Sequence, residues 1–171
     1  MRKYLVIGNP IEHSLSPLLH NFWIQKYNLN AFYEKQLLEK KDIEKILSDM
    51  RVSKIHGINV TVPFKNTVIP FLDQLSDTAQ ETQSVNTIFK RQNKLIGDNT
   101  DVYGFSEAVK LTNFNPVNKS ALILGAGGVV PSVLLALKNM GVEQITLSNR
   151  TKEKAINLKK KIFAYDCSFN K

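Results

Sequence analysis

The sequence contains little cysteine, little arginine and no long apolar run. Its single cysteine, Cys167, excludes an internal disulfide and fits a protein of a reducing compartment. The longest apolar stretch, around residues 129–137, is interrupted by Pro131 and Ser132. It falls far short of the roughly 20 residues that span a bilayer, and no segment resembles a signal peptide. These absences predict a soluble, cytoplasmic protein without a membrane partner.

Because arginine is scarce, lysine carries most of the positive charge. The chain has 23 lysines and arginines against 15 acidic residues, a net charge of +8, yet only four of the basic residues are arginines. The densest basic cluster, at residues 152–161, has the pattern of a solvated helix face. It lacks the interleaved aromatic residues of a single-strand binding groove. The pattern therefore favours compositional bias, with lysine-coated helices, over nucleic-acid binding, and at most the charge helps to attract anionic small molecules.

Hydrophobic periodicity in the first hundred residues alternates between strand and helix patterns. Residues 16–28 have apolar side chains at helical spacing, and Ser16 followed by Pro17 predicts a helix start with serine as the N-cap. Residues 84–90 and 94–98 predict a hairpin. The other predicted elements are strands at 3–8, at 31–38 and in the first part of 57–65, a helix at 40–51 with Ile43, Ile46, Leu47 and Met50 inward, and a helical region at 68–82.

A polar stretch at residues 112–120, with asparagine and proline, is the best candidate for a linker. Residues 104–111 before it predict a helix. After it come an apolar strand from Ala121, a helix at 129–140 that Gly141 stops, and a strand at 144–148. Strands that alternate with helices predict an α/β fold, with a parallel sheet in at least the second part.

A glycine-rich turn follows the strand that starts at Ala121. Gly125, Gly127 and Gly128 form the pattern G-x-G-G, and Val130 occupies the third glycine position of G-x-G-x-x-G. Glycine permits a tight turn and lets the backbone approach a pyrophosphate, which binds at the positive end of the next helix. Glycines also occur in ordinary turns, but the order strand, turn, helix is the one that a dinucleotide site requires.

The end of the next strand indicates which dinucleotide binds. An NAD site would place an acidic residue there to hold the ribose 2′-hydroxyl. This strand ends instead in Asn149, Arg150 and Thr151, and Lys152 and Lys154 follow. An arginine can bind a 2′-phosphate through two hydrogen bonds and can stack on the adenine. The alternative is a helix start with Thr151 as N-cap; we favour NADP.

Four short polar segments in the first part suggest a ligand. Ser14 and Ser16 stand at a predicted helix N-terminus, where hydroxyl groups and free N–H groups suit a carboxylate. Helix capping alone would explain Ser16 but not Ser14. Polar residues after apolar strands lie where open α/β sheets bind ligands. Together they predict a hydroxylated, anionic small molecule. The segments contain Ser14 and Ser16; Asn59, Thr61 and Lys65; Asn86 and Thr87; Asp98 and Asp101.

On these residues the sequence closely resembles the shikimate dehydrogenase (shikimate/quinate dehydrogenase) family. The matching motifs agree in identity, order and spacing: SLSPLLHN at 14–21, NVTVPFK at 59–65, VNTI at 85–88, GDNTDVYGF at 97–105, GAGG at 125–128 and NRT at 149–151. The resemblance implies a mixed-sheet substrate domain at 1–102, a linker helix and loop at 103–117, and a Rossmann-type NADP-binding domain at 118–171. That second domain would be incomplete, because two βαβαβ halves need more residues.

The resemblance also implies roles for individual residues. Ser14, Ser16 and Thr61 would hold the substrate carboxylate, and Asn59 and Asn86 would contact ring hydroxyls. Lys65 and Asp101 would be the catalytic pair, with Asp101 also accepting a substrate hydroxyl. A cis Val62–Pro63 bond is implied as well. The cofactor residues would be Asp77, Gly125, Ala126, Gly127, Gly128, Val129, Asn149, Arg150, Thr151 and Lys154.

The implied reaction is the reversible reduction of 3-dehydroshikimate by NADPH, with Lys65 stabilising the oxyanion and donating a proton. His20 is assigned a structural role, and the dispersed His13, His20 and His56 predict no metal site. Two segments depart from the family: VVPS follows the glycine turn, and TQS stands at 82–84 where the family has small residues and glycine. We expect the backbone at 82–84 to be less closely packed.

Three alternatives remain open on the sequence. A quinate/shikimate dehydrogenase would share nearly every motif. A domain that binds shikimate-like ligands without catalysis would fit a chain truncated within its NADP domain. A nucleic-acid binder is the most distant alternative. The residues do not determine the oligomeric state, so a homodimer is left open.

Overall fold

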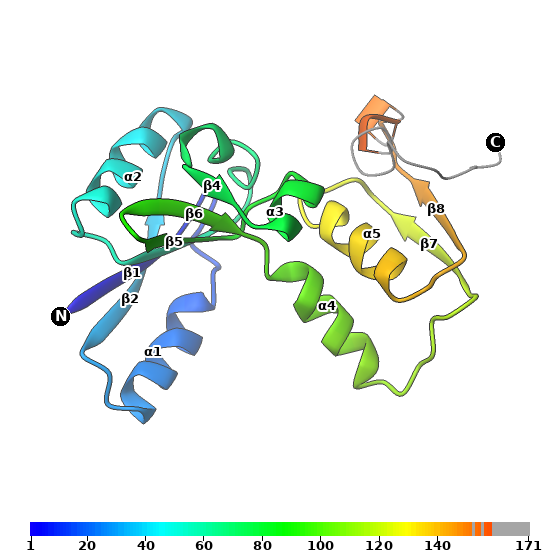
Figure 1. The fold of residues 1–171 in the computed structure, drawn as a ribbon, viewed down its shortest axis with the longest axis horizontal. Helices are drawn as coiled ribbons and strands as arrows, with labels where there is room; N and C mark the ends of the chain where they lie inside the picture. The colour runs from blue at the N-terminus through cyan, green and yellow to red at the C-terminus, as the bar shows by residue number, and fades with distance from the viewer. Residues whose placement is uncertain (152, 155, 159–171) are drawn as a thin grey trace. The chain divides into compact units, whose positions relative to one another are not determined.

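The computed structural model describes residues 1–151, 153–154 and 156–158 (Figure 1). It divides into two compact units: residues 1–79 with 85–98, and residues 80–84 with the chain from residue 99 onward. Lys152, Cys167 and much of the lysine-rich segment at 152–161 lie outside the described residues. Both units combine helices with strands, which confirms the predicted α/β class.

A six-stranded mixed sheet forms the first unit, with the strand order β2-β1-β3-β5-β6-β4. β1 pairs in parallel with β2 and β3, and β5 runs antiparallel to both β3 and β6. β4 pairs in parallel with β6. The mixed sheet confirms the prediction for the N-terminal part. The strands are β1 (Arg2–Gly8), β2 (Ala31–Leu37), β3 (Gly57–Val60), β4 (Gln74–Leu75), β5 (Thr87–Arg91) and β6 (Lys94–Asp98).

The main core lies on one face of this sheet, under helix α2 (Ile43–Arg51), which a short 3-10 helix, η1 (Lys40–Asp42), precedes. Strand residues two apart point to the same face, so Ile58 and Val60 of β3 both enter this core. The apolar residues of α2 recur at helical spacing and meet them there. The four residues predicted to face inward are all buried: Ile43, Ile46, Leu47 and Met50.

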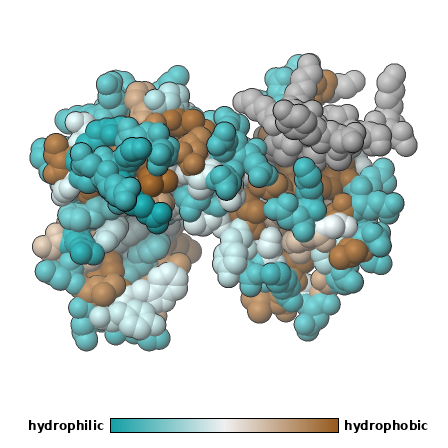
Figure 2. All heavy atoms as spheres, in the orientation of Figure 1, coloured by the Kyte–Doolittle hydropathy of each residue, from teal (hydrophilic) through white to brown (hydrophobic). Residues whose placement is uncertain are grey.

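Helix α1 (Ser16–Lys26) packs on the opposite face of the sheet, where Val6 and Tyr33 are buried and Ile24 of α1 packs against them. The outer side of α1 is also apolar: Leu18 is 74% exposed and Phe22 58%. Apolar side chains are visible at the surface over α1 in the space-filling view (Figure 2). The helical spacing predicted for this segment is confirmed, but it supplies apolar residues to both sides of the helix.

The prediction of one helical region at 68–82 is wrong. The segment consists of a 3-10 helix η2 (Ile69–Phe71), strand β4 and a short helix α3 (Asp77–Thr82). The Asp73 N–H donates to the Leu95 carbonyl at 3.0 Å, and the Asp73 carboxylate accepts from the Leu95 N–H at 2.7 Å. This pairing with β6 takes the backbone into the sheet and interrupts the helix.

The hairpin prediction is confirmed by β5 and β6. Gln92 and Asn93 occupy the two turn positions with φ angles of 48° and 65°. Positive φ at both central residues is the signature of a type I′ turn, whose twist matches that of the strands beside it. The tight turn fixes the register that places Thr87 opposite Asp98.

The second unit contains helix α4 (Asp101–Lys110), the parallel pair β7 (Ser120–Leu124) and β8 (Gln144–Ser148), and helix α5 (Val130–Asn139) between those strands. One face of the pair packs on α5 through Ile145 and Ile123. On its other face Leu122 is 63% exposed and Leu124 78%. The parallel strand–helix–strand order confirms the Rossmann-type prediction for this part of the chain.

A buried polar cluster joins three segments of the second unit. The Asn99 amide donates to the Thr82 hydroxyl at 3.1 Å, to the Ser84 carbonyl at 2.9 Å and to the Ser132 hydroxyl of α5 at 2.9 Å. The Asn99 carbonyl oxygen accepts from the Asp101 N–H at 3.0 Å. This last bond supports the start of α4, which begins at Asp101, three residues before the predicted start at 104.

The expected loose packing at residues 82–84 is therefore wrong. Thr82 is 2% exposed and Ser84 is 1% exposed. The hydroxyl and carbonyl groups of this segment bond Asn99, which lets the segment pack closely without glycine. The Ser84 hydroxyl itself is buried and has no hydrogen-bond partner among the described residues.

We expect Ser84→Ala to raise the free energy of unfolding by about 1 kcal/mol, because a buried hydroxyl without a partner carries a desolvation cost. Urea unfolding followed by circular dichroism measures the change. Ser132→Ala is the matched control: it removes a bonded hydroxyl and should lower stability by about 1 kcal/mol. A loss of stability in Ser84→Ala would contradict the expectation.

Candidate functional site

Ser14 and Ser16 stand at the start of α1, but their roles differ from the predicted ones. Leu15 occupies the N-cap position, and Ser16 is the first helical residue, followed by Pro17 in the first turn as predicted. The Ser14 hydroxyl accepts a hydrogen bond from the Ser16 N–H at 3.4 Å. The prediction that Ser16 is the N-cap is therefore wrong. The Ser16 side chain instead opposes the rise that burial causes in the pKa of Tyr33.

Asn59 lies on the α1 face of the sheet, because its neighbours Ile58 and Val60 take the core face. Its carbonyl oxygen accepts a hydrogen bond from the Tyr33 hydroxyl at 2.7 Å. Its amide nitrogen donates to the Asn86 carbonyl at 3.3 Å and to the Thr87 hydroxyl at 3.1 Å. The side chain thus bridges β2 and the start of β5.

Thr61 directly follows β3 and lies against β1. Its N–H donates to the Ile7 carbonyl at 2.9 Å. A Cβ added at Gly8 would lie 2.6 Å from the Thr61 methyl group, closer than real Cβ atoms approach any atom. Glycine at position 8 is therefore required for Thr61 to take this place. The Val62–Pro63 bond after Thr61 is cis, as the family resemblance implies, and the Asn9–Pro10 bond is also cis.

Lys65 is half-buried, and its backbone is held to the segment before β5. Phe64, which is buried, precedes it. The Lys65 carbonyl accepts from the Val85 N–H at 2.8 Å, and the next residue, Asn86, donates its N–H to the Asp98 carbonyl at 3.0 Å. Asn86 is itself buried, and its side-chain oxygen accepts from the Thr87 hydroxyl at 3.0 Å. These bonds hold the backbone of Lys65 beside the segment that contains Asn86.

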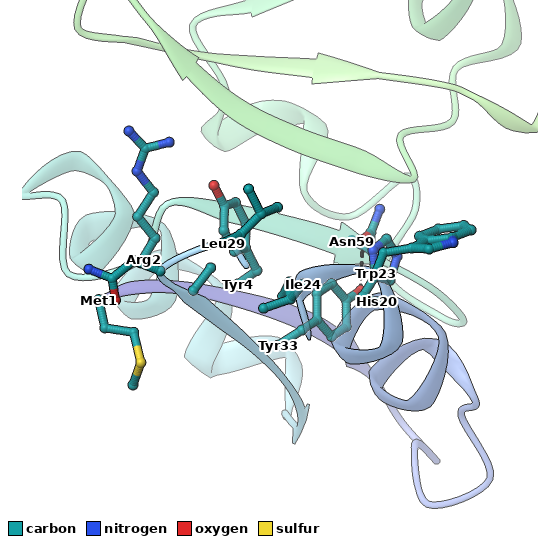
Figure 3. A pocket seen from close by; sticks show the side chains of 11 residues that line it. Met1, Arg2, Tyr4, His20, Trp23, Ile24, Leu29, Tyr33 and Asn59 are labelled. Atoms are coloured by element: carbon teal, nitrogen blue, oxygen red, sulfur yellow. Dashed lines mark hydrogen bonds between the residues drawn. The ribbon is translucent and has the colours of Figure 1, made fainter. Parts of the chain in front are cut away.

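The first unit thus brings together six predicted substrate residues at the ends of neighbouring strands and at one helix start: Ser14, Ser16, Asn59, Thr61, Lys65 and Asn86. A cavity of about 800 Å³ opens on the same face, between α1 and β2 (Figure 3). Its wall is mostly apolar and aromatic, and Asn59 is the predicted residue that it includes. Asp77, predicted near the nicotinamide, is exposed at the first position of α3.

The glycine-rich turn lies in the second unit between β7 and α5. Gly125 has a φ of +107°, a conformation that L side chains rarely adopt, and its N–H donates to the Ser148 carbonyl at 2.7 Å. Apart from Gly127 and its two chain neighbours, no atom of the described residues lies within 4 Å of a Cβ placed on Gly127. The backbone there is open to a ligand, and Gly128 and Val129 beside it are exposed. This open turn at the start of α5 fits a pyrophosphate.

Asn149 ties the glycine turn to the end of β8. Its side-chain oxygen accepts from the Ala126 N–H at 3.1 Å, and its nitrogen donates to the Thr151 carbonyl at 2.7 Å. Arg150, Thr151 and Lys154 are exposed. Asn149 therefore shapes the site through its own hydrogen bonds, and the basic residues beside it are accessible to a phosphate.

Asp101 occupies the first turn of α4 in the second unit, held by the Asn99 cluster. Tyr33, Asn99 and Ser132 were not predicted from the sequence. All three are polar and buried, with exposures of 5%, 3% and 0%. A tyrosine or serine inside an apolar segment is a signal for such bonding, because buried polar groups need partners.

Within the described residues no helix is both long and apolar enough to cross a bilayer. The same residues contain no group of three or more His, Cys, Asp or Glu side chains placed to hold a metal ion.

Comparison with family models gives two matches. The shikimate dehydrogenase substrate binding domain matches residues 6–88, and the shikimate/quinate 5-dehydrogenase domain matches residues 107–171. A shikimate dehydrogenase (NADP(+)) of Pelagibacter ubique is 60% identical over 159 residues, which are 93% of this chain and 60% of that protein. The corresponding protein of Aquifex aeolicus is 44% identical over 158 residues, 92% of this chain and 58% of that protein.

Comparison with solved structures gives matches of the same kind. The crystal structure of Aquifex aeolicus shikimate dehydrogenase superposes with a TM-score of 0.88 at 42% identity, and covers 94% of this chain and 60% of that one. The Thermus thermophilus enzyme in complex with NADP(H) and shikimate gives 0.85 at 33% identity, with 95% and 61% covered. The chain therefore spans about 60% of the length of the curated relatives that it matches.

We expect Gly125→Ala to lower the free energy of unfolding by about 1 to 2 kcal/mol, because alanine is strained at a φ of +107°. Gly127→Ala is the matched control: a Cβ there meets none of the described residues beyond its chain neighbours, so its stability should stay within about 0.5 kcal/mol of the original. Thermal unfolding compares the two variants. Equal effects would contradict the geometry of the turn.

Proposed function

The chain belongs to the shikimate dehydrogenase family, and we propose that the protein catalyses the reversible, NADPH-dependent reduction of 3-dehydroshikimate to shikimate. The observation that carries the proposal is the grouping of Ser14, Ser16, Asn59, Thr61, Lys65 and Asn86 in the first unit. Hydroxyl, amide and ammonium groups in one place suit a ligand with a carboxylate and several hydroxyls.

In this proposal Ser14, Ser16 and Thr61 bind the substrate carboxylate, and the start of α1 adds its N-terminal dipole. Asn59 and Asn86 contact ring hydroxyls. The Lys65 ammonium lies beside the reacting oxygen, stabilises the developing oxyanion and donates the proton that completes the alcohol. Asp101 is its proposed catalytic partner, and its carboxylate accepts a hydrogen bond from a substrate hydroxyl.

The second unit would hold NADP. The open backbone at Gly125, Ala126, Gly127, Gly128 and Val129 suits the pyrophosphate at the start of α5. Arg150 would bind the 2′-phosphate, with Asn149, Thr151 and Lys154 beside it, and Asp77 is proposed near the nicotinamide end. When bound, the cofactor supplies the hydride that reduces the ketone carbon.

The proposal extends to location and assembly. A sequence with a single cysteine suits the cytoplasm, where we place the reaction. We also propose a homodimer, because Leu15, Leu18 and Phe22 are exposed along α1 and line a shared groove. Apolar surface of this kind is typical of interaction sites.

A shikimate-binding domain without turnover is the second candidate, because the six grouped substrate residues all lie in the first unit, whereas Asp101 and the glycine turn lie in the second. Titration calorimetry with shikimate, beside the absorbance of NADPH formed from shikimate and NADP⁺, distinguishes the two. Binding with turnover supports the enzyme, and binding without turnover supports the second candidate. Absence of binding contradicts both. Quinate in the same assay measures substrate preference.

We expect Lys65→Ala to lower kcat by a factor of about 10² to 10⁴, with the Kd for shikimate changed by less than about threefold, because the ammonium acts on the reacting oxygen. Initial rates of NADPH formation and calorimetric titration measure the two quantities. Lys94→Ala, at an exposed position of β6, is the control and should change neither. An unchanged kcat in Lys65→Ala would remove Lys65 from the chemistry.

We expect Arg150→Ala to raise the Kd for NADP⁺ by a factor of about 10 to 100, the loss of one charge-assisted contact. The Kd for NAD⁺ and the KM for shikimate should hardly change, because neither ligand carries a 2′-phosphate. Lys138→Ala, in the last turn of α5, is the control. If NADP⁺ and NAD⁺ binding weakened equally, the phosphate role of Arg150 would be wrong.

A further inference from the structure

Tyr33 of β2 is held in place by two consecutive residues of α1. The Asn21 side chain donates to the Tyr33 carbonyl at 2.8 Å and accepts from the Tyr33 N–H at 3.0 Å. The His20 ring stacks on the Tyr33 ring, with centroids 4.2 Å apart and planes 8° apart. Burial lowers the pKa of His20, which favours the neutral ring. Asn21 thus holds the backbone of Tyr33, and His20 holds its ring.

The Tyr33 hydroxyl bonds one of the proposed substrate residues. It donates to the side-chain oxygen of Asn59 at 2.7 Å. Figure 3 shows this hydroxyl directed at Asn59, with His20 stacked on the ring. Burial raises the pKa of Tyr33 far above its ordinary value, despite the opposing effect of Ser16, so the hydroxyl keeps its proton and acts as a donor.

The hydrogen bonds of Asn59 then determine what its amide can offer a ligand. A side-chain amide has two N–H donors and an oxygen with two lone pairs. Both donors are directed to protein acceptors, the Asn86 carbonyl and the Thr87 hydroxyl. A flipped amide would place its oxygen against the Asn86 carbonyl, so this orientation is favoured. Tyr33 occupies one lone pair of the oxygen. No other residue of the described part of the chain donates to this oxygen, so its second lone pair is left for a ligand.

We propose that Tyr33 is a positioning residue that, together with Asn86 and Thr87, holds Asn59 as an acceptor-only group toward the substrate. Asn59 then binds a hydroxyl that donates a hydrogen bond and disfavours an oxygen that can only accept one, such as a ketone or an ether. In the proposed reaction this keeps the reacting ketone away from Asn59 and leaves it to Lys65. The inference rests on the proposed function for the identity of the ligand, but the state of the Asn59 amide is a property of the protein alone.

The first experiment uses the ligand-free protein. In Tyr33→Phe the ring and its stacking on His20 remain, but the donor to Asn59 is lost. We expect the side-chain amide signals of Asn59 in the ¹H–¹⁵N spectrum to shift and their hydrogen exchange to speed up at least several-fold. Tyr4→Phe, which removes a hydroxyl from the same cavity wall, is the control and should leave those signals in place. Unchanged Asn59 signals in Tyr33→Phe would overturn the proposal.

The second experiment is a double-mutant cycle on shikimate binding, with unfolding temperatures recorded for every variant. Tyr33→Phe should raise the Kd by a factor of about 3 to 10, the loss of one neutral hydrogen bond. It should have little further effect in the Asn59→Ala background, because Tyr33 acts through Asn59. Equal factors in both backgrounds would indicate a general structural role and overturn the proposal. If the original protein bound no shikimate, the proposed function would fail, and the spectrum of Asn59 would still decide the role of Tyr33.

Discussion

The two-residue alternation of β3 is the constraint on which the first unit depends. Ile58 and Val60 enter the core under α2, so Asn59, and Thr61 just beyond the strand, are left to the α1 face. A shift of register by one residue would bury the polar pair and expose the apolar one, which the core does not permit. The same burial that stabilises the sheet therefore sets the direction of two proposed ligand contacts.

Hydrogen bonds between side chains, and one between backbone groups, then hold these residues in fixed positions. Asn59 spans β2 and β5, the Lys65 carbonyl holds Val85, and Asn99 joins α4 to α5 in the second unit. Each of these bonds is at least partly shielded from water, so each broken partner would leave a polar group without compensation. The proposed chemistry thus rests on residues that the substrate would not touch, Tyr33 and Asn99 foremost.

Much of the fold was predictable from the sequence, because it follows from periodicity and turn residues. The strand pattern of 57–65, the inward face of 40–51 and the hairpin around Gln92 all have strong local signals, and all are present. The segment at 68–82 was not predictable, since its pairing with β6 depends on Asp73 meeting Leu95, which lies far away in the sequence. The segment at 82–84 shows the same limit. Its lack of the glycine that the family has there suggested loose packing, but hydrogen bonds from Asn99 hold the segment closely, and no local pattern in the sequence reveals them. For the candidate site, the motifs identified the polar residues, but only the fold shows which of them hydrogen-bond one another.

Gly8 carries a consequence for how such a sequence can vary. The Thr61 methyl group occupies the space that any side chain at position 8 would need. A Cβ at position 8 would also lie 3.0 Å from Ile11 and 3.1 Å from the Val62 carbonyl, so a smaller residue at 61 would not by itself make room for alanine. Losing the threonine would in addition remove a hydroxyl from the proposed carboxylate site. The glycine at position 8 thus supports a proposed ligand contact more than fifty positions away in the chain.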